Sequence, residues 1–337
     1  MDAFSGWLLR TWYSRYPVWF FIPFAWLFWL MSGLRQALYT FGVLGTAPSR
    51  LPIVVVGNIS VGGTGKTPFT VWLAAALAGK GRKVGIVTRG YGGASSRPML
   101  VTPDSDAKLA GDEAVLLARR TGLPVACAAD RPAAVELLAS RYALDVILSD
   151  DGLQHYRMPR AMEIVLLDGE RGLGNRWLLP AGPLRETEHR LETVDLVVIK
   201  RTGAARFTWP DAFYMPLTAA TAVSLVDARR VPLSEFSGQA VHAVAGIGNP
   251  EQFFSTLGQA GLQVQGHPLP DHALLQAADL DFPGTAPVFM TEKDAVKCRG
   301  MALTRHWYME AAADFDPVDQ EAILARVEQA LAAWCVH

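Results

Sequence analysis

The sequence predicts an α/β protein with a doubly wound, mainly parallel sheet, a smaller second α/β domain, and an N-terminal membrane-associated helix. Three observations predict this arrangement. Apolar runs of strand length alternate with amphipathic helical patterns after residue 50. This alternation weakens over residues 206–232 and then resumes. The first forty residues, in contrast, are rich in aromatic side chains and contain a long uncharged run.

The first 45 residues have the composition of a membrane anchor. The segment Tyr16–Leu34 contains no charged side chain and is flanked by arginines. As a helix it is roughly 28 Å long, just enough to reach across the hydrocarbon core of a bilayer. Half of the ten tryptophans lie before residue 30, and tryptophan prefers the headgroup boundary. We expect residues 1–45 to bind a membrane surface, spanning it or lying on it; the alternative is a helix buried against the protein's own core.

The pattern after the anchor divides into three further parts. Residues 46–205 predict a nucleotide-binding α/β domain, residues 206–232 an extended interdomain linker, and residues 233–337 a smaller α/β domain. The final helical pattern of the smaller domain is able to pack back on the first one. In the first domain we expect strands at Ile53–Gly57, Lys83–Arg89, Asp145–Ser149, Glu163–Leu167 and Leu196–Lys200.

A glycine-rich loop joins the first strand to the first helix in the stretch VVVGNISVGGTGKTPFTVWL. A strand, a tight glycine turn and a helix N-terminus together form a phosphate-binding P-loop, because backbone N–H groups and the helix dipole point at the anion. In this pattern the lysine reaches the β- and γ-phosphates of a nucleoside triphosphate such as ATP, and the threonine hydroxyl binds Mg²⁺. Ser60 replaces the first glycine of the usual pattern, but the following glycines keep the turn flexible. The expected phosphate-binding residues are Ser60, Val61, Gly62, Gly63, Thr64, Gly65, Lys66 and Thr67.

Two adjacent aspartates, Asp150 and Asp151, directly follow an aliphatic strand pattern. A P-loop protein needs a carboxylate at the end of a neighbouring strand to position Mg²⁺. We expect this pair on the metal side of the site; the alternative is that both are turn or helix-capping residues.

A second acidic pair, Asp112 and Glu113, opens an amphipathic helical pattern. This is a strand-to-helix connection, where doubly wound proteins place their sites. From spacing alone Asp112 is equally explained as a helix cap, and His272 as a surface or core histidine. A kinase nevertheless needs a carboxylate near the acceptor hydroxyl to take or orient its proton. Basic residues in RGYGG and LLPAGPLRETEHR are suited to an anionic acceptor, or are simply solvated.

The overall charge and the cysteines exclude several classes of protein. The formal net charge is −1, which argues against nucleic acid as a partner. The three cysteines form no close pair and have no metal-ligand spacing, so neither a disulfide framework nor a structural metal site is expected. No feature of the sequence predicts an obligate protein partner.

Together these motifs resemble the tetraacyldisaccharide 4'-kinase family of lipid A synthesis. The resemblance covers nearly the whole chain, and it rests on the apolar N-terminal helix and on a series of motifs in the family's order. These motifs are VGNISVGGTGKTP, TRGYGG, GDEA, SDDGLQH, LLPAGPLRE, AGIGNP, PDH and TEKDAVK. The serine at the start of the loop also fits the family's own form.

The resemblance implies transfer of the ATP γ-phosphoryl group to the 4'-hydroxyl of an acylated glucosamine disaccharide 1-phosphate, at the cytoplasmic face of the bacterial inner membrane. It implies that Lys66 and Thr67 bind phosphate and Mg²⁺, with Asp150, Asp151 and Glu113 near the metal. Asp112 then takes or orients the acceptor proton with help from His272. Gln154 and His155 would lie close by in a lesser role.

Two other functions are compatible with the P-loop. One is a membrane-bound nucleotide switch of the ParA/MinD kind, whose loop has a signature lysine just before its two glycines. Here that position is Val61, and the apolar helix is N-terminal rather than C-terminal. The other is a kinase of a soluble small molecule, which leaves the aromatic N-terminus unexplained.

Overall fold

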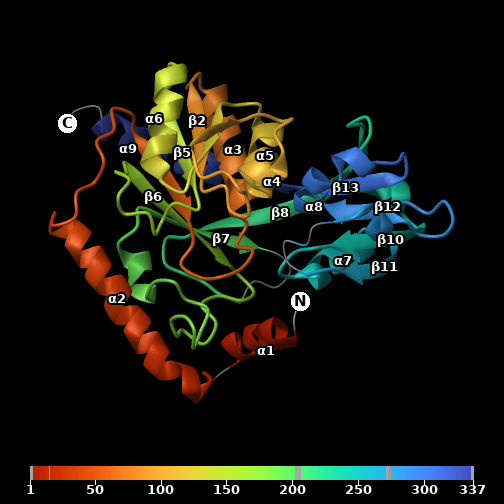
Figure 1. Cartoon of the computed structure of the whole chain (residues 1–337), viewed down its shortest axis with the longest axis horizontal. Helices are drawn as coiled ribbons and strands as arrows, with labels where there is room; N and C mark the ends of the chain where they lie inside the picture. The colour runs from red at the N-terminus through yellow and green to blue at the C-terminus, as the bar shows by residue number, and fades with distance from the viewer. Residues whose placement is uncertain (1–2, 15, 202–205, 271–272, 274, 335–337) are drawn as a thin grey trace.

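The computed structural model describes residues 3–14, 16–201, 206–270, 273 and 275–334. These residues form a 13-stranded sheet that extends through two bodies (Figure 1). The strand order is β11-β10-β12-β13-β8-β7-β6-β1-β5-β2-β4-β3, with β9 paired to β8. The predicted α/β class, with its doubly wound and mainly parallel sheet, is confirmed.

The larger body contains the parallel half of the sheet. Its strands are β1 (Ile53–Gly57), β2 (Val84–Thr88), β3 (Met99–Val101), β4 (Val125–Cys127), β5 (Val146–Asp150), β6 (Met162–Asp168) and β7 (Leu196–Arg201). Its helices are α3 (Lys66–Gly79), α4 (Ala107–Ala110), α5 (Asp112–Thr121) and α6 (Arg131–Arg141), with a short 3-10 turn η2 (Glu188–Glu192). All pairs among these strands are parallel except β3 with β4.

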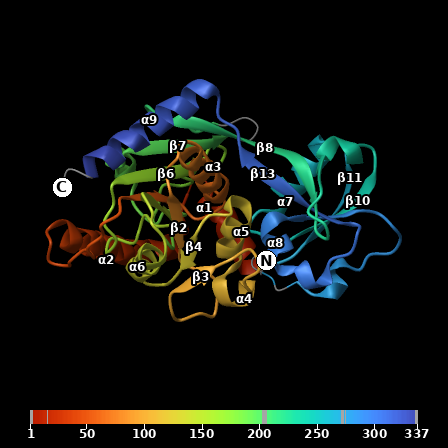
Figure 2. The ribbon, with the colours of Figure 1, turned by 90° about the horizontal axis from the view of Figure 1, so that it is seen from above.

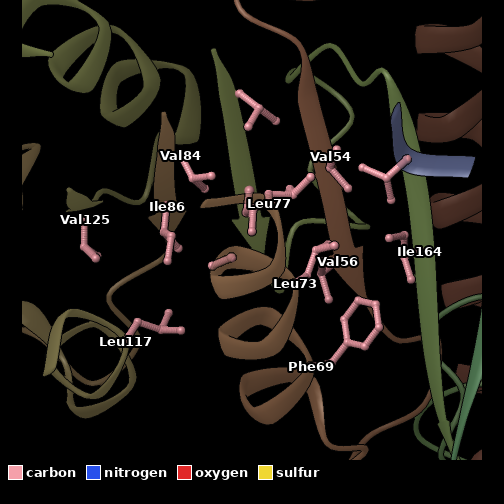
Figure 3. Packing of buried hydrophobic residues seen from close by; sticks show 14 of the residues in the cluster. Val54, Val56, Phe69, Leu73, Leu77, Val84, Ile86, Leu117, Val125 and Ile164 are labelled. Carbon is pink, nitrogen blue, oxygen red and sulfur yellow. The ribbon is translucent and has the colours of Figure 1, made fainter. Parts of the chain in front are cut away.

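Both faces of this sheet are buried, which explains why its strands are continuous apolar runs rather than alternating ones. On β1, Val54 and Val56 point into one core cluster, while Ile53 and Val55 point into another on the opposite face. Figure 3 shows Val54 and Val56 packed against Phe69 and the other apolar side chains of α3. The central strand and the helix after the P-loop are therefore held in a fixed relation.

A long strand, β8 (Phe213–Ser224), joins the two bodies (Figure 2). Its first residues pair in parallel with β7, and the rest pairs antiparallel with β13 (His306–Ala313). β9 (Arg230–Pro232) also pairs with β8. The segment 206–232, for which the sequence suggests an extended linker, is thus largely sheet.

The smaller body places strands and helices around its own core. It contains η3 (Leu233–Phe236), β10 (Ala240–Ala245), α7 (Pro250–Gln259), β11 (Gln263–Pro268), η4 (Ala277–Leu280), β12 (Val288–Thr291), α8 (Glu292–Lys297) and η5 (Arg299–Met301). β10, β11, β12 and β13 are parallel to one another. The last helix, α9 (Pro317–Trp334), returns to the larger body and buries Ile323, Val327 and Leu331 in its core (Figure 2).

The N-terminal segment forms α1 (Ala3–Trp12), the single turn η1 (Trp19–Phe21) and α2 (Ile22–Thr40). Figure 1 shows α2 as a rod at the periphery of the larger body. Only Ala25 of α2 is buried, and most of the exposed side chains are large and apolar. Within the described residues, no helix combines the length and the apolarity needed to cross a membrane.

Candidate active site

The P-loop lies between β1 and α3, where the sequence predicts it. Gly62 and Gly65 adopt φ values of 126° and 83°, which favour glycine because other residues are strained there. The Thr64 amide donates to the Gly62 carbonyl at 3.0 Å, and α3 begins at Lys66 with no side-chain cap on its free N–H groups. Uncapped amides and the positive end of a helix dipole favour a nearby anion.

A buried ion pair between Lys200 and Asp168 contacts the P-loop. Lys200, at the end of β7, bonds to the Asp168 carboxylate at 2.6 Å and donates to the Gly63 carbonyl at 2.8 Å. Burial would raise the pKa of Asp168, but Lys200 and the amides of residues 170 and 171 lower it, so this carboxylate is ionised. A Cβ on Gly65 would come within 2.8 Å of the Met215 methyl group. The side chains of Lys200 and Met215 are therefore packed closely against the P-loop.

The N-terminal segment also reaches the loop. The Tyr13 hydroxyl donates to the Val61 carbonyl at 3.2 Å, and the Arg171 guanidinium lies over the Tyr13 ring at 5.2 Å. Trp12 is 7% exposed, and its indole N–H donates to the Pro180 carbonyl at 2.8 Å. The start of the chain is thereby packed against the nucleotide side of the protein.

Asp150 and Asp151 are placed at the end of β5, beside the P-loop strand. The Lys66 Nζ lies 3.3 Å from the Asp151 Oδ1, and Thr70 donates to the Asp150 Oδ1 at 3.0 Å. Burial, and then the negative charge of Glu113, raise the pKa of Asp150 to about 6. Burial acts in the same direction on Asp151, but Lys66 and the neighbouring arginines lower the pKa of Asp151 to about 2.

Two arginines that the sequence analysis did not single out hold this pair in position. Arg185 lies 3.3 Å from the Asp151 Oδ1, and Arg131 donates to the Asp151 carbonyl at 3.0 Å. Asp151 has a φ of 50°, a conformation that a non-glycine residue adopts only when its surroundings enforce it. Arg185 belongs to the basic stretch LLPAGPLRETEHR. The sequence therefore points to this stretch as a whole and not to Arg185 itself.

Asp112 and Glu113 form the first turn of α5, next to the smaller body. Glu113 forms an ion pair with Lys293. Burial acts to lower the pKa of Lys293, but the negative charges of Glu113, and then of Asp112 and Asp150, raise it. Asp112 is 6% exposed; its Oδ1 accepts the Glu113 amide at 3.0 Å, and its Oδ2 lies 3.7 Å from the Lys297 Nζ. Lys293 and Lys297 come from α8, in the motif TEKDAVK, so the site draws on both bodies.

The remaining predicted residues are distributed as follows. His272 lies outside the described residues, so the structure says nothing of its place. The Gln154 amide donates to the Glu186 carboxylate at 2.8 Å and to the Asn58 carbonyl at 3.0 Å. Burial lowers the pKa of His155 to about 4, which makes it a neutral group at pH 7.

A cavity of about 1380 Å³ connects these groups. Val61 through Thr67, Glu113 and Asp151 line it, and so do Lys293 from the smaller body and Arg35 from α2. Ser60, Asp112 and Asp150 are buried and do not belong to the lining. Among the part of the chain that the structure describes, no three histidine, cysteine or acidic side chains form a ready-made metal cluster.

Comparison with known proteins agrees with this geometry. The family model described as tetraacyldisaccharide-1-P 4'-kinase matches residues 17–331. The chain is 46% identical to the tetraacyldisaccharide 4'-kinase of Nitrosococcus oceani, over 98% of this chain and 97% of that one. It is 47% identical to the tetraacyldisaccharide 4'-kinase of Alkalilimnicola ehrlichii, over 93% of this chain and 95% of that one.

A solved structure supports the same assignment. The crystal structure of LpxK from Aquifex aeolicus, described as an "apo" form in complex with ATP, superposes with a TM-score of 0.79 at 26% identity. The superposition covers 92% of this chain and 98% of the Aquifex aeolicus chain. The chain belongs to the tetraacyldisaccharide-1-P 4'-kinase family.

Proposed function

We propose that this protein transfers the γ-phosphoryl group of ATP to the 4'-hydroxyl of a tetraacylated glucosamine disaccharide 1-phosphate. The observation that carries the proposal is the single cavity that joins the P-loop to α2. One side of this cavity suits a nucleoside triphosphate, and the other is bordered by an exposed apolar helix. A nucleotide and a lipid acceptor are the two substrates that such a site brings together.

The P-loop residues Ser60 to Thr67 hold the ATP phosphates in this proposal. Lys66 exchanges its contact with Asp151 for the β- and γ-phosphate oxygens, because phosphate carries more charge than one carboxylate. Phosphoryl transfer is accelerated mainly by positioning and by neutralising charge on the transferred group. Lys66, Arg185 and Lys293 supply positive charge around the cavity.

The carboxylates fit a magnesium ion. Mg²⁺ prefers oxygen ligands, and the residues that would hold it are Thr67, Glu113, Asp150 and Asp151. The raised pKa of Asp150 reflects a burial of negative charge beside Glu113 that a cation would relieve. When bound, the ion supplies charge neutralisation at the phosphates.

Asp112 takes or orients the proton of the acceptor hydroxyl, with His272 as its partner. Support comes from the position of Asp112 at the start of α5, next to Glu113, which lines the cavity. The Lys297 Nζ lies 3.7 Å from the Asp112 Oδ2, and a nearby positive charge favours the ionised form of a carboxylate. An ionised carboxylate is the form that accepts a proton.

The proposed place of action is the cytoplasmic face of the bacterial inner membrane. Trp19, Phe20 and Phe24 are 79, 71 and 51% exposed at the N-terminal end of the α2 region. Tryptophan and phenylalanine at this density favour the membrane interface. A four-chain lipid does not leave the bilayer readily, because each exposed methylene costs about 0.8 kcal/mol, so the enzyme has to come to it.

Vesicle binding tests this placement. A variant with Trp19, Phe20 and Phe24 all changed to serine should lose most of its co-sedimentation with phospholipid vesicles. The matched control changes three exposed apolar residues elsewhere, Tyr142, Leu303 and Val318, to serine. Equal sedimentation of both variants and the wild type would exclude an anchoring role for this end of the segment.

The reaction itself is tested with γ-labelled ATP and the acylated disaccharide 1-phosphate in detergent micelles. We expect label in the lipid fraction, and none with Lys66→Ala. Label recovered only as inorganic phosphate from the wild type would contradict a kinase function.

A further inference from the structure

The end of α1, Trp12 and the following Tyr13, is fastened to the loop between β6 and β7. The Trp12 indole N–H donates to the Pro180 carbonyl at 2.8 Å, and the Trp12 carbonyl accepts the Asn175 amide at 2.8 Å. A Cβ on Gly174 would come within 2.7 Å of the Trp12 carbonyl oxygen, so a side chain does not fit there. Figure 1 shows α1 beside this light-green loop. The place of Tyr13 is thereby fixed by the residue before it.

Tyr13 holds one peptide unit of the P-loop. Its hydroxyl donates to the Val61 carbonyl at 3.2 Å, while the Val61 amide donates to the Pro183 carbonyl at 2.8 Å. In a planar trans peptide, the carbonyl of one residue and the N–H of the next point in opposite directions. The bond from Tyr13 therefore turns the Gly62 N–H away from Tyr13. Gly62 lines the large cavity and Tyr13 does not, so Tyr13 acts on the loop from outside the cavity.

The surroundings keep the Tyr13 hydroxyl in its donating form. Burial raises the pKa of Tyr13, and the charge of Arg171, whose guanidinium lies over the ring at 5.2 Å, only partly offsets this effect. The Arg171 amide in turn donates to the Asp168 carboxylate at 3.1 Å. Asp168 also pairs with Lys200, which donates to the Gly63 carbonyl. Tyr13 and Lys200 thus hold two different peptide units of the same loop through connected supports.

We propose that Tyr13 is a positioning residue for ATP, which keeps the first half of the P-loop in the form that receives phosphate. The inference rests on the proposed function only in taking ATP as the nucleotide. A loop with glycine at positions 62, 63 and 65 has many conformations available to it. Only the conformers whose amides face the phosphates bind ATP, and the apparent Kd rises as their population falls. The N-terminal segment then contributes to nucleotide affinity as well as to the proposed membrane attachment.

Nucleotide binding measured without any acceptor tests this role. Calorimetric titration with β,γ-imido-ATP and Mg²⁺ gives Kd for the wild type and for Tyr13→Phe, which keeps the ring beneath Arg171 and removes only the hydroxyl. Tyr142→Phe is the matched control, because Tyr142 loses the same hydroxyl but follows α6, is 42% exposed and does not line the cavity. A further variant replaces Tyr13 by 4-aminophenylalanine, which restores an N–H donor at the same place.

We expect Tyr13→Phe to weaken nucleotide binding by roughly three- to tenfold, the loss of one neutral hydrogen bond. KM for ATP should rise by the same factor, whereas kcat at saturating ATP should stay at the wild-type value, because bound phosphate itself holds the loop. KM for the lipid acceptor and co-sedimentation with vesicles should also be unchanged. The 4-aminophenylalanine protein should recover most of the affinity, and Tyr142→Phe should bind like the wild type.

Three results would overturn this role of Tyr13. They are wild-type nucleotide affinity in Tyr13→Phe, a rise in KM for the acceptor alone, and a loss of affinity that 4-aminophenylalanine does not restore. The proposed kinase function fails separately. A protein that binds the nucleotide as expected but phosphorylates no acylated acceptor would contradict that function and leave the role of Tyr13 standing.

Discussion

Asp150 and Asp151 are neighbours in sequence but have opposite electrostatic surroundings. Asp150 is buried and faces the negative charge of Glu113, whereas Asp151 is flanked by Lys66 and Arg185. The pKa of the first is raised and that of the second is lowered. At pH 7 we therefore expect ionised Asp150 to destabilise the folded protein and ionised Asp151 to stabilise it.

In the absence of nucleotide and Mg²⁺, Asp150→Asn should stabilise the protein at pH 7. The pKa of Asp150 in the folded protein, about 6, exceeds the ordinary 3.8. The fold therefore favours the neutral carboxyl group, and the stability that this group contributes is present below pH 3.8 and lost as pH rises toward 6. This difference corresponds to ~3 kcal/mol, and asparagine keeps the acceptor for Thr70. Thermal unfolding should therefore show a midpoint raised by a few degrees, with loss of kinase activity.

The control for this prediction is Asp151→Asn, which should lower the unfolding midpoint. The folded pKa of Asp151, about 2, lies below the ordinary value, so its stabilising effect is present above pH 3.8 and is lost as pH falls toward 2. Two asparagine variants that shift the midpoint in the same direction would contradict the electrostatic account.

Asp112→Asn should reduce kcat by about 10²- to 10⁴-fold, the range typical of a lost proton acceptor. The fold should persist, because Lys297 keeps its second partner, Asp294, at 3.3 Å. Circular dichroism checks the fold and the micelle assay checks kcat. Asp106→Asn, which preserves a helix cap on nearby α4, is the neutral control. An Asp112→Asn enzyme with full kcat would remove this residue from the catalytic role.

At the scale of single residues, motifs on neighbouring strands predict which side chains come together, but they do not reveal the residues that only the fold brings near. The contact of Lys66 with Asp151 follows from two motifs on adjacent strands. Tyr13 and Lys200 also contact the P-loop, but they are 48 and 137 residues away from their partners. No local pattern signals a contact over such separations.

Among the elements, the central strands were the easiest to predict. β1 begins and ends where the sequence suggests, since a buried parallel strand is a continuous apolar run. β3 and β4 were not foreseen; each has only three residues, too few to display a period. Over β8 the sequence predicts an extended linker; the structure shows a strand joining the two bodies, whose middle residues alternate between exposed and half-buried positions.

A pair of histidines on β10 and β11 should make the smaller body sensitive to acid. The His242 Nδ1 and His267 Nε2 are 3.1 Å apart, and both rings stack on Phe282. Burial, and then His242, lower the pKa of His267. The folded state therefore favours the neutral ring, and the stability it contributes is present above about pH 6.5 and lost as pH falls.

Replacing His267 by glutamine should flatten the fall of the unfolding midpoint between pH 7.5 and 5. The amide retains a polar group near His242 but does not titrate. His189→Gln is the control, because His189 is well exposed and lies 2.7 Å from Glu192. A His267→Gln protein with the wild-type pH dependence would show that this pair is not responsible.

At the scale of the whole molecule, the two bodies are joined by buried ion pairs as well as by the shared sheet. Arg120 of α5 lies 2.6 Å from Glu292 and 3.2 Å from Glu310, both in the smaller body, and all three are largely buried. Burial raises the pKa of Glu292 although Arg120 opposes it. Removing the arginine would leave two carboxylates without their shared cation.

Arg120→Met should destabilise the protein by about 3–5 kcal/mol, the range for breaking a buried ion pair. Denaturant unfolding followed by tryptophan fluorescence measures this. Arg230→Met is a matched control, because Arg230 also pairs with Glu310, at 3.2 Å, but is 62% exposed. Equal effects of the two substitutions would mean that the buried pair does not hold the bodies together.

The most direct measurement of the central claim is the position of the new phosphate in the product. Purified protein is incubated with ATP, Mg²⁺ and the acylated disaccharide 1-phosphate, and the lipid is examined by ³¹P and ¹H NMR. We predict a second phosphomonoester coupled to the proton at C4', with the 1-phosphate retained. A product phosphorylated at another hydroxyl, or an unchanged lipid with ATP consumed, would contradict the account.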